Sequence, residues 1–422
     1  MKYQLDDKPG IGAMVLYGLQ WWVVSLPCVV IMGVVVARLH YTDIGAQTFY
    51  LQKLFGVMGT ATLVQIFMGH RLPLVVGPAA TLLVGIVAAT ASSINAVYTA
   101  ILAGGAILAV IGYSGLMTRL RFFFTPRIIA VILILIAFTL CPTILKLVFP
   151  GPDHAIFHLC FALTTVGVLI LWNTWAPGVW KSMTVIIGIA GGTLVYLLVL
   201  GTPSLGTAGA DPESYFLFLP RLEFHMGTLF SFVFCFLALI INELGSIESV
   251  GHMLKADTMA PRIRSGMGLQ GLANMAAGGL GVIGPVDFSL SAGVIAATGC
   301  ASRFTLAPAG VGLVLCAFIP QLVLLLSHIP SPVMGALMLY LMSAQLASGL
   351  AMLVSEKGVT DFNSGITVSL PLMVGILISF APPEVMSRFP ELIRPIIGNG
   401  FAMGTLTVVI LEHIVFRKGK EN

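Results

Sequence analysis

Three ionisable side chains, Glu243, Glu248 and His252, lie at the end of an apolar stretch that begins near Leu229. An ionisable side chain inside a membrane costs about 2.5–3.5 kcal/mol on insertion scales, so it marks a functional site by default. Glu248 and His252 are four residues apart and share a helix face. Glu243 points about 140° away from Glu248 around the same helix. Carboxylates at these positions could accept N–H groups of a ligand, and all three side chains could carry protons.

Two of these residues also have a simpler interpretation. His252 lies close to Lys255 at the end of the apolar stretch and could merely be hydrated. Glu243 could be a packed carboxylic acid that stays neutral or is hydrogen-bonded to a neighbouring helix. Glu248 is the strongest candidate of the three.

The composition indicates a polytopic membrane protein, because 58% of the 422 residues are hydrophobic and only 9% are charged. A membrane-spanning helix needs roughly 20 apolar residues. The sequence predicts fourteen spans, at 12–37, 47–69, 72–92, 96–116, 125–149, 155–173, 180–202, 226–252, 266–284, 286–301, 304–327, 332–354, 361–380 and 390–415. Stretches such as 128–140 are apolar on every face, which excludes the alternating pattern of a β-barrel.

Several other classes are excluded or unsupported. The six cysteines lie in apolar stretches without CxxC spacing, so we expect packed thiols and neither disulfides nor a metal site. No phosphate-binding glycine loop or soluble nucleotide-binding domain is visible, so an ion gradient would have to drive any transport. The net charge of +4 gives no reason to expect a nucleic-acid partner, and no cofactor is expected.

The positive-inside rule predicts the orientation. With fourteen spans, fifteen of the 21 Lys and Arg residues fall on the side of the termini and six on the other. We therefore expect a multi-pass protein of the inner membrane with both termini in the cytoplasm. The first apolar stretch lacks a cleavage site and is interpreted as a retained helix.

The chain divides near residues 203–224 into two halves of seven spans each, and an odd number of crossings gives the halves opposite orientations. This is the arithmetic of an inverted repeat. The third and tenth spans are interrupted by Gly and Pro in corresponding places, "LPLVVGPAATLLVG" (72–85) and "GVIGPVDFSLSAGVIAATG" (281–299). Broken segments in matching positions are the best sequence indication of a transporter binding site, although Gly and Pro are also common in ordinary membrane helices.

Two motifs resemble those of one family. "ESVGH" (248–252) is similar to the eighth-helix signature of the nucleobase-ascorbate transporters, the nucleobase:cation symporter-2 family of xanthine and uracil permeases. "FSLSAGVIAATGCASR" (288–303) resembles that family's tenth-segment motif, with matches at Phe288, Ser289, Gly293, Thr298, Gly299, Ser302 and Arg303. "YGLQWW" (17–22) and "VVGPAATLL" (75–83) are weaker likenesses to the first and third segments.

The resemblance implies an all-α protein of fourteen segments in a seven-plus-seven inverted repeat, with segments three and ten each built as a short strand plus a half-helix. It also implies a core domain (1–116 and 225–327), a gate domain (117–224 and 328–422) and commonly a homodimer. In that family the residue at the position of Glu248 grips the base. The chain departs from the pattern at Leu290 and Ser291, where relatives carry Gln or Glu and then Asn, and at Trp21, where they carry His.

A binding mode follows from these residues. A planar heterocycle would lie between the two broken segments, against unwound backbone around Ala79, Ala80, Phe288 and Ser289. Phe288 or Trp21 could stack on the ring, and Ser289 and Ser291 could donate or accept hydrogen bonds. Glu248 would accept two adjacent N–H groups, a charge-assisted pairing. Leu290 would favour an apolar edge of the ligand or a backbone contact there.

Glu243, Asp287 and His252 are the candidates for carrying a coupled proton, because burial favours the neutral form of a carboxyl. Asp287 could equally cap the short helix that follows it.

The sequence therefore predicts a secondary transporter for proton-coupled nucleobase uptake by alternating access, with sodium as another possible coupling ion. Which base is carried stays open. An anion transporter of the same fold is the alternative, but Glu248 would repel an anion. An intramembrane enzyme or receptor has no supporting residues, since no Ser/His/Asp spacing or metal cluster is present.

Overall fold

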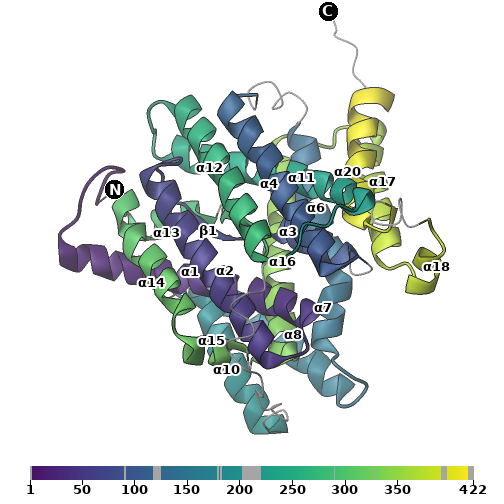
Figure 1. Cartoon of the computed structure of the whole chain (residues 1–422), viewed down its shortest axis with the longest axis horizontal. Helices are drawn as coiled ribbons and strands as arrows, with labels where there is room; N and C mark the ends of the chain where they lie inside the picture. The colour runs from purple at the N-terminus through teal and green to yellow at the C-terminus, as the bar shows by residue number, and fades with distance from the viewer. Residues whose placement is uncertain are drawn as a thin grey trace, which may run out of the picture.

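A computed structural model describes residues 2–89, 92–116, 125–177, 180, 183–201, 220–288, 290–327, 329–390 and 397–416. The protein is a bundle of helices with one two-stranded ribbon inside it (Figure 1). In the first half of the chain the elements are α1 (Ile11–His40), α2 (Ile44–Phe67), β1 (Val75–Pro78), α3 (Ala80–Ala88), α4 (Ile94–Ser114), α6 (Pro126–Thr139), α7 (Cys141–Val148), α8 (Ala155–Trp175) and α10 (Thr184–Leu200).

The second half follows the same order. It contains α11 (Met226–Met253), α12 (Met259–Leu280), β2 (Pro285–Phe288), α13 (Leu290–Thr298), the 3-10 helix η3 (Arg303–Leu306), α14 (Ala307–Ala317), α15 (Pro320–Ser327), α16 (Ser331–Ser355), α17 (Phe362–Ser379), α18 (Pro383–Ser387), α20 (Gly400–Ile410) and the π-helical turn η4 (Leu411–Val415). Every predicted span overlaps one of these elements or two or three consecutive ones, although the span 390–415 lies partly outside the described residues.

Seven helical segments among the described residues are long and apolar enough to cross a membrane. They are α1, α4, α6 with α7, α8, α11, α16 and α17. The helices α2 and α12 have 24 and 22 residues but are more polar: α2 carries Lys53 and Gln65, and α12 carries Arg262, Arg264 and Gln270. The protein is therefore an all-helical polytopic membrane protein, and the number fourteen stays a prediction.

One predicted boundary was wrong. The connection 252–266 was expected to be a loop, but α12 already begins at Met259 and includes Pro261, Arg262 and Arg264. Proline fits the first turn of a helix, where its missing N–H has no helical partner to lose. The polar residues of this turn were mistaken for a loop because they do not look like membrane helix.

The two Gly/Pro-interrupted segments form the ribbon. β1 pairs with β2 in antiparallel register, with Val75 opposite Phe288, Val76 opposite Asp287 and Gly77 opposite Val286. In each half a four-residue strand is followed, after one residue, by a nine-residue helix. The prediction of a short strand plus a half-helix in both segments is confirmed.

The helices pack in two groups, and the ribbon contacts α1, α2, α11 and α12. In the first, α4 lies along α12, α2 lies against α14, and α1 contacts α2 and α14. In the second, α6 packs against α16 and α17, while α17 packs against α20 (Figure 1). Glycines make the α4–α12 contact close: a Cβ at Gly271 would overlap the backbone of Ala109, and one at Gly112 would overlap Gly268. Small residues allow backbones to approach in this way in membrane helix pairs.

All six cysteines are free thiols, and the described residues hold no group of His, Cys, Asp and Glu fit for a metal ion. The expectation that all six are packed was wrong for Cys160, which is exposed on α8, and Cys141 is only half-buried. Large parts of α8, α16 and α17 are similarly exposed and apolar. Such surface suits lipid, where apolar side chains meet no water.

Candidate substrate site

The ribbon brings the two broken segments together at the centre of the protein. Phe288 lies over Gly77, where a Cβ would overlap its ring. Beyond the strand pairs, Ala79 N–H donates to the carbonyl of Gly284 at 2.9 Å and extends the pairing to the start of α3. A glycine at position 77 is therefore what allows the Phe288 ring to lie close against the neighbouring strand.

The half-helices α3 and α13 both start beside the ribbon. Ala79 is the N-cap of α3 and supplies no side-chain hydrogen bond to its first turn. Ala79 is buried and Ala80 half-buried. Helix N-termini carry unsatisfied N–H groups and a partial positive charge, so they suit carbonyl or anionic groups of a ligand.

Ser291 fastens the start of α13 to β1. Its hydroxyl accepts from the backbone N–H of Val75 at 3.0 Å and donates to the carbonyl of Phe288 at 2.8 Å. The side chain is fully buried. Ser291 thus has a structural role in the ribbon, and both of its hydroxyl interactions are made within the protein.

The long helix α11 presents two different faces. On one face the Glu243 carboxylate accepts from Asp287 N–H at 2.9 Å, and the Ser246 hydroxyl donates to the Asp287 carbonyl at 3.0 Å. On the other face Gly245 and Ser249 are exposed and Glu248 is half-buried. Glu243 therefore holds β2, while Glu248 lies on an accessible side of the helix, as its angular separation from Glu243 predicts.

The structure describes three predicted site residues incompletely or not at all. Ser289 lies outside the described residues. Leu290 is the first residue of α13 and His252 lies in the last turn of α11, but their side chains are not described. In the described residues the site on this side therefore consists of the backbone at positions 288, 290 and 291 and the side chains of Phe288 and Ser291.

Trp21 is packed. It is 2% exposed, and its indole N–H donates to the Thr305 hydroxyl on η3 at 3.1 Å. The helix α1 also contacts β1. The polar end of Trp21 is thus occupied within the protein, and only its ring faces would be available for stacking.

No described contact joins the Asp287 side chain to α13, the short helix that it was alternatively expected to cap. Its carboxylate Oδ2 lies 3.1 Å from His70 Nε2, and both side chains are 0% exposed. His70 lies between α2 and β1 and was missed by the sequence analysis. The signal available was an imidazole three residues after α2, directly before a Gly/Pro-broken segment.

Further buried polar side chains surround β2. Gln65 on α2 donates to Gln270 Oε1 at 2.8 Å and to the carbonyl of Gly266 at 2.9 Å. Asn274 on α12 donates to the carbonyl of Pro285 at 3.0 Å. These amides tie α2 and α12 to the start of β2 and provide a polar environment beneath the ribbon.

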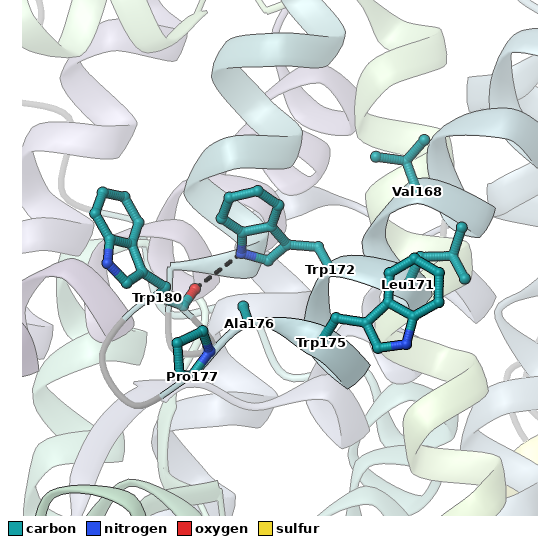
Figure 2. Close-up of a pocket in the computed structure, with 7 residues that line it drawn as sticks. All are labelled: Val168, Leu171, Trp172, Trp175, Ala176, Pro177 and Trp180. Atoms are coloured by element: carbon teal, nitrogen blue, oxygen red, sulfur yellow. Dashed lines mark hydrogen bonds between the residues drawn. The ribbon is translucent and has the colours of Figure 1, made fainter.

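An apolar groove of about 630 Å³ lies elsewhere, at the end of α8 (Figure 2). It is lined by Val168, Leu171, Trp172, Trp175, Ala176, Pro177 and Trp180. Trp172 Nε1 donates to the carbonyl of Trp180 at 2.9 Å, and Trp175 and Trp180 are strongly exposed. Tryptophans gather at membrane–water interfaces, so this groove fits the end of a membrane helix better than a polar solute site.

Comparison with known proteins agrees with this geometry. The model of the xanthine/uracil permease family, described as a permease family, matches residues 12–384. The xanthine permease of Bacillus subtilis (strain 168) is 22% identical over 427 residues, covering 98% of this chain and 97% of that protein. The nucleobase transporter PlUacP of Paenibacillus larvae is 24% identical over 376 residues, or 84% of each chain.

The fold also resembles solved transporters. The transmembrane domain of the cyanobacterial bicarbonate transporter BicA superposes with a TM-score of 0.62 at 15% identity, covering 89% of this chain and 98% of that domain. At such low identity the likeness establishes the architecture alone.

Proposed function

The chain belongs to the xanthine/uracil permease family, and from this premise we propose that it takes up a nucleobase by proton-coupled alternating access. It is a membrane transporter by family and not an enzyme. The observation that carries the proposal is the ribbon of β1 and β2, which joins two half-helix starts and contacts α11, the helix that bears Glu248. A planar ligand bound there can meet backbone N–H groups, an aromatic ring and a carboxylate.

Each group has a role in the proposed complex. Glu248 accepts two adjacent N–H groups of the base, a charge-assisted pairing that is stronger than a neutral one. Phe288 stacks on the base, and we prefer it to Trp21 because the Trp21 indole N–H is already bonded to Thr305. Backbone at Ala79, Ala80 and Ser289 offers donors and acceptors to the rest of the ring. Leu290 faces a less polar edge of the base, and Ser291 supports the binding backbone.

The proposed architecture is a seven-plus-seven inverted repeat of fourteen segments. The helix contacts support this repeat. For several pairs of segments that pack against each other, the segments seven positions before or after them in the chain also pack against each other. The pair α4–α12 becomes α14–α2, α1–α2 becomes α11–α12, and α17–α20 corresponds to α8–α10. A pseudo-twofold axis in the membrane plane that relates the two halves of the chain would pair β1 with β2 in the antiparallel direction, as is observed.

The same packing supports the proposed division into a core domain (1–116 and 225–327) and a gate domain (117–224 and 328–422). Helices α1, α2, α4, α11, α12 and α14 pack among themselves, as do α6, α8, α10, α16, α17 and α20. Rocking of one group against the other would open the Glu248 face alternately to the two sides. Both termini would lie in the cytoplasm of an inner-membrane protein, and the exposed apolar faces would serve lipid and a homodimer contact.

An anion transporter is the second candidate, because the fold is shared with a bicarbonate transporter. Helix N-termini at α3 and α13 suit an anion. The half-buried Glu248 carboxylate on the accessible face of α11 opposes one, which is why a neutral ligand bearing N–H groups is preferred.

Ligand-dependent thermal stability tests the proposal. Purified protein would be heated with uracil, xanthine, hypoxanthine, adenine, guanine, urate, sulfate or bicarbonate, beside Glu248→Gln and the exposed control Glu356→Gln. A ligand at 100 times its Kd should stabilise by about 2.7 kcal/mol. Stabilisation by one base that is lost in Glu248→Gln and kept in the control is expected. Stabilisation by an anion and by no base would overturn the nucleobase proposal.

A further inference from the structure

Three ionisable side chains from three separate segments meet beneath the ribbon. His70 precedes β1, Asp287 is on β2, and Glu243 is on α11, and all three are 0% exposed. His70 Nε2 lies 3.1 Å from Asp287 Oδ2, and the Glu243 carboxylate accepts from Asp287 N–H at 2.9 Å. The two carboxyl groups are also close enough to interact with each other. We call these three residues the carboxyl–imidazole cluster.

The hydrogen bonds of His70 fix its tautomer. The backbone N–H of Leu72 donates to His70 Nδ1 at 2.9 Å, so Nδ1 must keep its lone pair. The ring proton of a neutral imidazole then lies on Nε2, which is 3.1 Å from Asp287 Oδ2 but has no hydrogen-bond partner in the described structure. The backbone of His70 is held as well, since its carbonyl accepts from Arg262 Nη1 at 3.0 Å. His70 is thus held in place beside Asp287, and it could gain a second proton only by losing the Leu72 hydrogen bond.

No side chain of Lys or Arg in the described part of the chain forms an ion pair with either carboxyl. The Arg262 guanidinium is directed to the carbonyls of His70 and Arg71. The neighbours from α11, α2 and α12 are the uncharged Ser246, Gln65, Gln270 and Asn274. Lys53 on α2 donates to the carbonyl of Leu280, at the far end of α12 from Arg262.

Two buried carboxyls without a cation cannot both be ionised at low cost, so adjacent carboxyls share one proton. Glu243 Oε1, both carboxylate oxygens of Asp287 and His70 Nε2 have no hydrogen-bond partner in the described structure, which leaves oxygens on both carboxyl groups to receive a proton. A metal ion is a poorer occupant, since these groups do not form a ligand set.

The cluster is connected to the substrate site through β2. Glu243 and Ser246 hold the N–H and the carbonyl of Asp287, the residue directly before Phe288. Ionising or neutralising Glu243 changes the strength of its bond to Asp287 N–H, because a carboxylate accepts more strongly than a carboxylic acid. Proton binding would therefore alter how firmly α11 holds the strand against which the ligand stacks.

We propose that the Glu243–Asp287 carboxyl pair is the binding site of the co-transported proton and that His70 is a positioning residue beside Asp287 that does not itself carry this proton. This inference rests on the proposed function. The proton comes from water on the outer side, forms an O–H bond at Glu243, and leaves to water on the cytoplasmic side when that bond breaks. Glu248 lies on another face of α11, where it would bind the ligand.

Proteoliposomes test the inference with three readings: exchange of labelled base across the membrane, accumulation of base against its gradient driven by a pH difference, and the pH profile of uptake. The base is the one identified by thermal stabilisation. The variants are Glu243→Gln, His70→Gln and His70→Leu, beside the exposed control Glu356→Gln. Glutamine at position 70 can present an N–H near the position of Nε2 without titrating, whereas leucine cannot.

Glu243→Gln is expected to keep exchange, to lose accumulation at least tenfold and to flatten the pH profile. His70→Gln should keep accumulation and pH profile within about threefold of the wild type, and His70→Leu should lose accumulation. In the wild type, uptake should fall as pH rises, because the unprotonated pair cannot deliver its proton.

Accumulation and a pH profile like the wild type in Glu243→Gln would overturn the assignment while leaving nucleobase transport intact. Loss of accumulation in His70→Gln, with exchange kept, would show that the imidazole itself carries the proton. Accumulation driven by a sodium gradient and not by a pH difference would mean that the co-transported ion is sodium and not a proton. Failure of the wild type to exchange any base would instead reject the proposed function.

Discussion

The backbone N–H of Asp287 on β2 donates to the carboxylate of Glu243 on α11 at 2.9 Å, across 44 positions of sequence. The carbonyl of the same residue accepts from Ser246, one helical turn further along α11. Two side chains of one helix therefore bind both backbone groups of one strand residue. A short strand in the middle of a membrane protein has few backbone partners, and these bonds satisfy groups that β1 leaves unpaired.

Replacing Ser246 by alanine should loosen this attachment. The Asp287 carbonyl is buried, and loss of a partner for a buried polar group costs about 1–3 kcal/mol. We expect a lower melting temperature and weaker binding of the transported base in Ser246→Ala. Ser348→Ala is the control, because the exposed Ser348 hydroxyl bonds only to the carbonyl of Ala344 in its own helix. Equal melting temperatures for the two variants would mean that Ser246 adds nothing to the ribbon.

Gly77→Ala should disturb the ligand-stacking ring directly. A Cβ at this position would overlap the Phe288 ring, and the ring or the strand must then move. Overpacking of this kind costs about 1–3 kcal/mol. We expect base affinity to fall by about tenfold or more, measured by the ligand-dependent shift in melting temperature. Gly191→Ala on α10 provides the comparison, since its Cβ would meet nothing within 4 Å. If the base raised the melting temperature of Gly77→Ala as much as that of the wild type, Phe288 would not be part of the binding site.

The α4–α12 contact should be sensitive to a single methyl group. At Gly271 the added Cβ would overlap backbone atoms of Ala109, which cannot swing aside as a flexible side chain can. Gly279 lies on the same helix, where a Cβ would reach only Leu102 at 4.0 Å. Alanine is favoured over glycine within a helix by about 1 kcal/mol. Gly271→Ala should therefore lower the melting temperature in detergent, while Gly279→Ala should leave it unchanged or raise it. The opposite order would contradict close packing of these helices.

The sequence predicted the ribbon because its signal is local. Gly and Pro interrupt the third and tenth segments, at 72–85 and 281–299. Each segment contains a short strand and a half-helix in the structure, as predicted. The separation of Glu243 from Glu248 around α11 was likewise predictable, since it depends only on helix geometry. Periodicity and breaking residues act within a few positions and can be read without tertiary contacts.

Contacts between distant segments could not be predicted in this way. His70 follows the end of α2 and precedes Arg71, and the residues around it in the sequence do not indicate that it is buried. Its burial depends on Arg262, which caps the carbonyls of His70 and Arg71 from the first turns of α12. That turn had itself been interpreted as a loop. Because His70 was overlooked and the first turn of α12 was interpreted as a loop, the buried interaction between His70 and Arg262 could not be predicted.

Leu290 is the position at which the chain departs most clearly from the family pattern, and changing it tests how specificity arises. It begins α13, directly beside Ser291, whose hydroxyl is committed to Val75 and Phe288. The family's amide at this position would offer a donor and an acceptor to the base. Leu290→Gln should therefore strengthen binding of bases with a carbonyl and an N–H on that edge, such as xanthine, relative to bases with a less polar edge.

The expected gain is about 0.5–1.5 kcal/mol, the usual net contribution of one hydrogen bond, which corresponds to roughly 2- to 12-fold in Kd. Competition of a base panel against one labelled base would measure the change in order of affinities. Leu290→Met keeps the volume and apolar character and should preserve the wild-type order. An unchanged order in Leu290→Gln would mean that the backbone at positions 288–291, held by Ser291 and Asp287, makes the contacts that select the base.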